Sequence, residues 1–128
     1  MHLSEAYEQM GGEIILRLLV DRFYDLMDDD PDYFGIRKLH PKELNNSRQK
    51  LFVFLSGWTG GPSLYIEKYG EPRLRSRHLP FSIGVVERDQ WLSCMNRAMK
   101  ETGLEEQLRI SLAKAFVQTA DFMQNQVE

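Results

Sequence analysis

The sequence has little cysteine and no long apolar run. Cys94 is the single cysteine among 128 residues, so the chain can form neither an internal disulfide nor a zinc site built from several thiolates. No apolar stretch approaches the roughly 20 residues that are needed to cross a bilayer, and the first residues do not read as a signal peptide. We therefore expect a cytoplasmic protein without membrane contact, in which Cys94 is a small buried hydrophobe.

The sequence also lacks an excess of positive charge: it has 16 Lys and Arg residues and 19 Asp and Glu residues, for a net charge of −3. A general nucleic-acid binder is usually basic overall, so that role would need a local basic patch. Hydrophobic residues make up 42% and charged residues 27%, which predicts a globular chain. The length suits one domain that spans residues 1–128.

No stretch longer than a few residues shows the alternation of apolar and polar residues that is typical of a strand. Apolar residues recur instead at helical spacing, between glycine and proline breakers, which predicts an all-α fold. One short helix is also expected within the irregular segment 63–77. The predicted long helices run from after Gly12 to before Pro31, from just after Pro41 to Gly60, from about Val86 to Glu101, and from Leu104 to Met123.

Metal-ligand patterns are sparse. The acidic run "DDDPD" at 28–32 lacks the alternating ligands, glycine and closing glutamate of an EF-hand, so it reads as a helix stop. The histidines, His2, His40 and His78, do not share a helical face at close spacing, which argues against a zinc site with several histidines. One histidine suffices for haem, because the porphyrin supplies four nitrogens. A lone histidine is more often structural, so both interpretations of His78 stay open on chemistry alone.

Positive charge gathers around His78 in the stretch "RLRSRHLPF" at 73–81. Lys68, Arg73, Arg75 and Arg77 fit a solvated loop, a phosphate-binding patch, or a carboxylate site in which arginine makes paired hydrogen bonds.

Tyr24 and Trp91 each bring a polar group to an apolar helix. Their simplest interpretation is core packing, with the tyrosine hydroxyl reaching water and the indole N–H needing an acceptor if it is fully buried. If both point into one cavity together with His78, they form a polar constellation in an apolar pocket.

Five motifs together resemble the truncated haemoglobins, specifically their second group. They are "GG" at 11–12, "DRFYDLM" at 21–27, "SRQKLFVFLSGWTGGPSLY" at 47–65, "YGEPRLRSRHLPF" at 69–81 and "ERDQWLSCM" at 87–95. They cover most of the chain in the family's order and at about its spacing. The resemblance implies an all-α truncated globin, a two-over-two helical sandwich around haem b.

The same resemblance assigns residues to the site. His78 matches the proximal iron ligand, Tyr24 the distal tyrosine that hydrogen-bonds bound ligand, and Trp91 the tryptophan that marks the second group. His40 and Ser47 match positions that border the ligand.

Haem contacts are expected from a charged edge that would pair with the propionates and from one helical stripe, formed by Ser47, Leu51, Phe54, Leu55 and Trp58. Glu71 and Thr59 depart from the family's common residues, at positions expected to lie outside the iron's first shell. The expected cofactor-binding residues are Lys50, Leu51, Phe54, Trp58, Tyr65, Arg75, Arg77 and Phe81.

The resemblance implies binding of dioxygen, carbon monoxide and nitric oxide at a single histidine-ligated iron. Donors that hold dioxygen suit redox chemistry on the bound ligand, such as nitric oxide dioxygenase or peroxidase-like activity with a separate reductase. The alternative is oxygen binding, delivery or sensing without turnover. A monomer or weak homodimer is expected. A haem-free helical domain that binds nucleic acid or protein through its basic loop would leave Tyr24, Trp91 and His78 unexplained.

Overall fold

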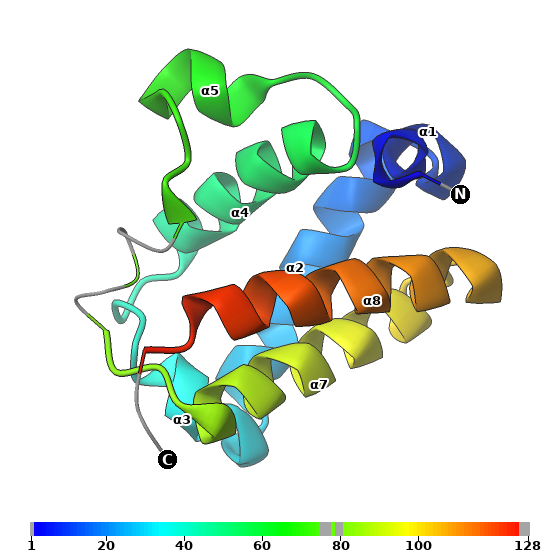
Figure 1. The fold of residues 1–128 in the computed structure, drawn as a ribbon. Coiled ribbons are helices and arrows are strands. Elements are labelled where there is room, and N and C mark those ends of the chain that lie inside the picture. Colours follow the sequence, from blue (N-terminus) through cyan, green and yellow to red (C-terminus); the bar gives the residue numbers. More distant parts are fainter. Residues whose placement is uncertain (1, 75–77, 79–80, 126–128) are drawn as a thin grey trace.

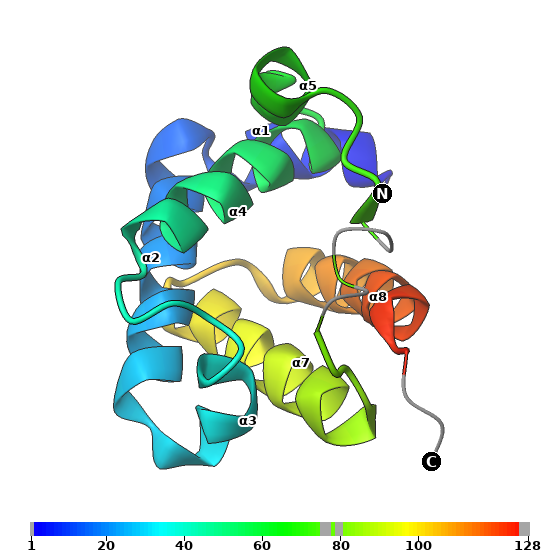
Figure 2. The same cartoon turned by 90° about the vertical axis from the view of Figure 1, so that its left-hand side faces the viewer.

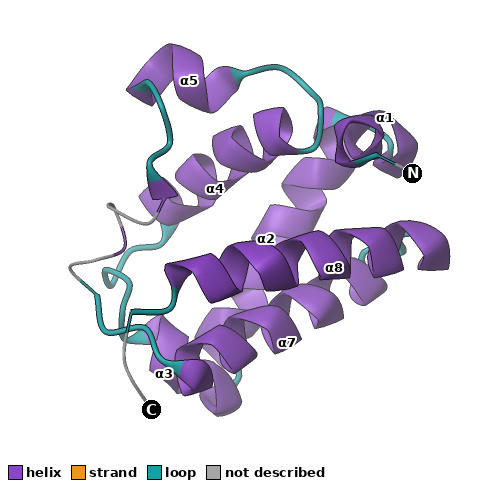
Figure 3. Ribbon diagram, in the orientation of Figure 1, coloured by secondary structure: helices purple, strands orange, loops and turns teal. Residues whose placement is uncertain are grey.

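The computed structural model describes residues 2–74, 78 and 81–125. These residues form helices, turns and loops and contain no strand (Figure 3). In chain order the elements are η1 (Leu3–Glu5), α1 (Ala6–Met10), α2 (Glu13–Asp29), η2 (Pro31–Tyr33), α3 (Phe34–Arg37), α4 (Asn45–Trp58), α5 (Leu64–Tyr69), α7 (Val85–Glu101) and α8 (Glu106–Met123).

The four long helices form two pairs. α7 and α8 lie side by side and form one pair. α2 crosses behind them and packs against α4, which lies above α7 and α8 in Figure 1 (Figures 1 and 2). α2 packs against both α4 and α7, so it joins the two layers. This arrangement is the predicted two-over-two helical sandwich.

The core lies where α2 packs on α4 and α7 and where α7 packs on α8. Apolar residues at helical spacing bury one face of each helix, as the sequence pattern predicts. The largest fully buried side chains are Phe23, Leu16, Leu19, Met27, Leu55, Met95, Met99, Leu108 and Leu112.

Two glycines set the start of α2. Gly11 and Gly12 have φ angles of 112° and 78°, a region that side chains with a Cβ rarely adopt. They turn the chain sharply between α1 and α2, at the breaker that the sequence indicated. α2 then ends at Asp29, just before Pro31, also as predicted.

The second long helix begins later than predicted. α4 starts at Asn45 and not just after Pro41. The Arg37 guanidinium donates to the carbonyl oxygens of Pro41 at 2.9 Å and Lys42 at 2.8 Å, which holds this segment as a loop. The short helices α1 and α3 were not predicted, because four or five residues are too few to show a helical period.

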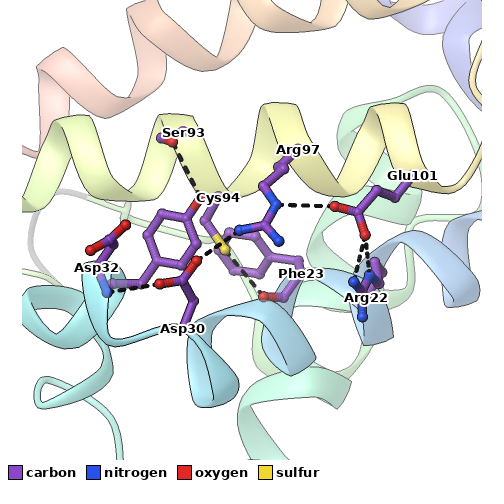
Figure 4. Close-up of polar contacts among 9 residues, drawn as sticks. Arg22, Phe23, Asp30, Asp32, Ser93, Cys94, Arg97 and Glu101 are labelled. Atoms are coloured by element: carbon purple, nitrogen blue, oxygen red, sulfur yellow. Dashed lines mark hydrogen bonds and ion pairs between the residues drawn. The ribbon is translucent and has the colours of Figure 1, made fainter.

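A charged network ties α2 to α7 (Figure 4). Arg97 donates to Asp30 at 2.8 Å and to Glu101 at 3.0 Å, and Glu101 also pairs with Arg22 on α2. Because Arg97 and Glu101 of α7 bind both Asp30, just after α2, and Arg22 within it, the network helps to fix how α7 sits along α2.

Cys94 faces the interior between the same two helices. It is fully buried, and its Sγ lies 3.2 Å from the carbonyl oxygen of Phe23, to which the thiol donates (Figure 4). Burial raises the pKa of the Cys94 thiol to about 12. The prediction of a small buried hydrophobe is confirmed.

Candidate functional site

A cavity of about 490 Å³ opens between α4 and the α7–α8 pair. We call it the central cavity. Its volume lies in the range of about 300–1,000 Å³ that is usual for cofactor pockets. Side chains from α2, α3, α4, α7 and α8 line it, together with His40 and Pro41 before α4 and the described residues near His78.

One face of α4 forms a wall of this cavity. The predicted stripe, Ser47, Leu51, Phe54, Leu55 and Trp58, lines it in full. An aromatic row continues across to α8, because the rings of Trp58 and Phe116 stack with their centroids 4.7 Å apart. The wall is therefore mostly apolar and aromatic, which suits an apolar macrocycle.

His78 lines the central cavity with a defined tautomer. Its Nδ1 lies 2.7 Å from the carbonyl oxygen of Leu74, and because a carbonyl can only accept, Nδ1 carries the proton. The lone pair of the neutral ring is then on Nε2, the atom left for a metal. A backbone partner on the other ring nitrogen is the usual support of a histidine that ligates a metal.

Tyr24 reaches the central cavity from α2. Its side chain is 5% exposed, and its ring packs edge-on against Phe23 and His40, with centroids 5.0 Å and 5.7 Å away. Burial raises the pKa of Tyr24 above its usual range, with a smaller opposing effect from Arg48. The hydroxyl therefore stays protonated at physiological pH and serves as a hydrogen-bond donor.

Trp91 reaches the same cavity from α7. Its half-buried ring lies 5.2 Å from Phe23 and 5.3 Å from Phe116, measured between centroids. The indole N–H is a donor only. Tyr24 and Trp91 thus bring two donors of fixed protonation to one cavity.

His40 brings a different chemistry. Its Nδ1 donates to the carbonyl oxygen of Ile36 at 2.8 Å, and the Ile36 N–H donates in turn to Gln90 Oε1 at 3.1 Å. Burial, opposed by the Ile36 hydrogen bond and helped by nearby Arg37, lowers the pKa of His40. The ring is neutral near pH 7, with its lone pair on Nε2. His40 thus lines the cavity as an acceptor.

The expected haem edge is only partly placed. Lys50 and Phe81 line the central cavity, and the Lys50 ammonium lies 5.7 Å from the centroid of the Tyr69 ring. Tyr65 is buried behind the wall, with its ring 6.0 Å from that of Phe54, and is not a lining residue. Arg75 and Arg77 lie outside the described residues.

Sequence reasoning missed several lining residues and one supporting residue. Glu87 and Arg88 line the central cavity at the start of α7, and Arg88 pairs with Asp121 of α8 at 2.8 Å. Gln90 supports His40 through Ile36. The sequence could have indicated that Gln90 lies near the site, because it precedes Trp91 and so faces a neighbouring side of α7. The sequence does not reveal that its partner is Ile36.

The residues of this cavity fit a haem. A mostly apolar wall and a histidine whose Nδ1 is bound to a backbone carbonyl, with the lone pair on Nε2, meet the needs of a porphyrin whose iron takes one protein nitrogen. Among the described residues no three His, Cys, Asp or Glu cluster to hold a bare metal ion, and no helix is long and apolar enough to span a membrane.

Comparisons with known proteins agree with this fit. The family described as bacterial-like globin matches residues 5–125. Group 2 truncated hemoglobin YjbI of Bacillus subtilis is 41% identical over 125 residues, which cover 98% of this chain and 92% of that protein.

Solved structures show the same fold. The group II 2-on-2 hemoglobin of the plant pathogen Agrobacterium tumefaciens superposes with a TM-score of 0.92 at 43% identity, over 95% of each chain. The truncated oxygen-avid haemoglobin of Bacillus subtilis gives a TM-score of 0.85 at 42% identity, over 94% of this chain and 98% of that one.

Fold and cavity define a helical protein that encloses a haem and binds small ligands there. The chain belongs to the bacterial-like globin family, and within it to the group II truncated haemoglobins. Its cofactor is haem b, and it binds dioxygen and other diatomic gases.

Proposed function

We propose that this protein oxidises nitric oxide with bound dioxygen and does not act chiefly as a carrier. The overall reaction is NO + O₂ + e⁻ → NO₃⁻, and a separate one-electron reductase supplies the electron. The observation that supports it is the meeting of two donors of fixed protonation, Tyr24 and Trp91, in the cavity that also receives His78.

Each residue has a proposed role. When haem is bound, its iron offers one open position for diatomic ligands and exchanges electrons with a donor. His78 would hold the iron through Nε2, with Nδ1–H fixed on Leu74. Tyr24 and Trp91 would donate to dioxygen at the haem, where negative charge gathers, inside a cavity of low polarity. Ser47 leaves an entry path open because its side chain is small.

Firm retention favours chemistry over delivery. A carrier has to release dioxygen, whereas donors that slow its escape keep it in place until nitric oxide arrives. The similarity to a haemoglobin described as oxygen-avid supports the same view. We propose that the remaining predicted contacts, Leu51, Phe54, Trp58, Lys50 and Phe81, seat the macrocycle.

The test is nitric oxide consumption by the haem-loaded protein in aerated buffer. With an electrode as detector and a reductase system present, repeated pulses of nitric oxide should be consumed and recovered as nitrate. Consumption that stops after one equivalent per haem, with the reductant still active, would show a ligand binder. The His78→Ala protein is the control for reaction at free haem.

A second candidate function, peroxide reduction, is favoured by the acceptor state of His40. Reduction follows H₂O₂ + 2e⁻ + 2H⁺ → 2H₂O, with the electrons drawn from a one-electron donor such as a phenol. A neutral Nε2 can take a proton from peroxide as it binds and return it to the departing oxygen. The His40→Gln variant should lose peroxide turnover and keep nitric oxide turnover. If the variant and the wild type turn over peroxide at equal rates, this candidate function is excluded.

A further inference from the structure

Asn125, two residues beyond the end of α8, binds the segment that carries His78. Its Nδ2 donates to the carbonyl oxygen of Phe81 at 2.9 Å and to that of His78 at 3.2 Å. Its Oδ1 accepts from the Ile83 N–H at 3.0 Å, and its own backbone N–H donates to the Ile83 carbonyl at 2.8 Å. Among the described residues, Asn125 thus makes four hydrogen bonds to His78, Phe81 and Ile83.

These bonds replace the support that a helix would give. Phe81 to Gly84 form no helix, so their backbone groups need partners from elsewhere. The His78 carbonyl oxygen accepts from the Phe81 N–H at 3.0 Å and from Asn125 Nδ2 at 3.2 Å. The backbone of the histidine is therefore bound both by Phe81 and by Asn125.

The end of α8, from which Asn125 follows, is itself fixed by an ion pair. Near the end of α8, Asp121 pairs with Arg88 in the first turn of α7 at 2.8 Å. Glu87 of the same turn accepts from the Gly84 N–H at 2.7 Å, directly after the segment that Asn125 binds. The start of α7, the end of α8 and the His78 segment thus form one connected unit.

We propose that Asn125 is a positioning residue for His78, on which it acts through the carbonyl oxygens of His78 and Phe81 and the backbone of Ile83. The proposal rests on His78 being the iron ligand. Asn125 does not itself line the central cavity, so its effect should fall on the bond between the protein and the iron.

The first test compares haem-loaded wild type with Asn125→Ala. We expect transfer of haem to an excess of an apoglobin acceptor to be about 10- to 100-fold faster in the variant, the range for loss of a residue that supports a metal ligand. In the reduced protein, resonance Raman spectra should show the iron–histidine stretching band shifted or broadened. Asn96→Ala, an exposed asparagine on α7, is the matched control and should leave both readouts unchanged.

Asn125→Asp separates the two halves of the contact. The carboxylate still accepts from Ile83 and so retains the anchor, but it cannot donate to the carbonyls of His78 and Phe81. The proposal requires that this variant also shift the band and lose haem faster. Wild-type behaviour in Asn125→Asp would overturn it even if Asn125→Ala does not fold.

His78→Ala distinguishes failure of this proposal from failure of the site assignment. If the iron–histidine band vanishes in His78→Ala and is unchanged in both Asn125 variants, Asn125 has no positioning role. If the band persists in His78→Ala, the ligand itself is wrong, and the proposal falls with it.

Discussion

Replacing Tyr24 with phenylalanine removes one hydroxyl from the central cavity and keeps the ring that packs on Phe23 and His40. A hydrogen bond to a charged group contributes about 1.5–3 kcal/mol. Since each 1.4 kcal/mol is a factor of ten, dioxygen should dissociate about 10- to 150-fold faster from Tyr24→Phe. Carbon monoxide carries little charge on its outer atom, so its dissociation should change far less.

Stopped-flow displacement measures both rates, with carbon monoxide displacing dioxygen and nitric oxide displacing carbon monoxide. Tyr33→Phe is the matched control, because Tyr33 is also 5% exposed but bonds Ser93 at 3.3 Å and does not line the central cavity. A dioxygen rate in Tyr24→Phe within twofold of the Tyr33→Phe rate would refute the donor role. Equal acceleration for both ligands would point to a widened cavity instead of a lost hydrogen bond.

Three further predictions concern Trp91, His40 and Cys94. Trp91→Phe should speed dioxygen dissociation through loss of the indole N–H, by about tenfold for one hydrogen bond of about 1.5 kcal/mol, as measured by the same displacement. Because the pKa of His40 is lowered in the folded protein, the unfolded state takes up a proton first as the pH falls below about 6.5. The free energy of unfolding of the wild type should therefore decrease between pH 7 and pH 5, and that of His40→Gln should decrease less. Urea titration of both proteins at the two pH values measures this difference. Cys94, buried and with its pKa raised to about 12, should resist maleimide labelling at pH 8 until urea unfolds the chain, and mass spectrometry would expose the error if labelling preceded unfolding.

The sequence predicts the long helices because their signals are local. Apolar spacing indicates α2, α7 and α8, and the breakers Gly12 and Pro31 lie close to the bounds of α2. The stripe on α4 is also a local pattern, but spacing alone fits a core stripe equally well, so its place along a haem cavity is implied by the family resemblance. Convergence of Tyr24, Trp91 and His78 required the family resemblance, because nothing in their separations shows that α2 and α7 face the same space.

What the sequence does not show is where single polar partners lie. Asn125 bonds a segment more than 40 residues earlier, and Gln90 bonds Ile36 across a separation of 54 residues. Neither residue type nor spacing predicts such contacts. The tautomer of His40 follows from one backbone carbonyl, so only the structure distinguishes a donor from an acceptor at that position.

Two neighbouring residues of α7 contribute to the central cavity in different ways. Gln90 supports His40 through Ile36, while Trp91 itself lines the cavity. A helix turns by about 100° per residue. One residue inserted or deleted between Arg88 and Gln90 would rotate Arg88 by about 100° relative to Gln90 and Trp91. The Arg88–Asp121 ion pair and the contacts of Gln90 and Trp91 could then not form together. Relatives of this protein can therefore change residues here, but we expect the spacing from Arg88 to Gln90 to be the same in all that retain both contacts.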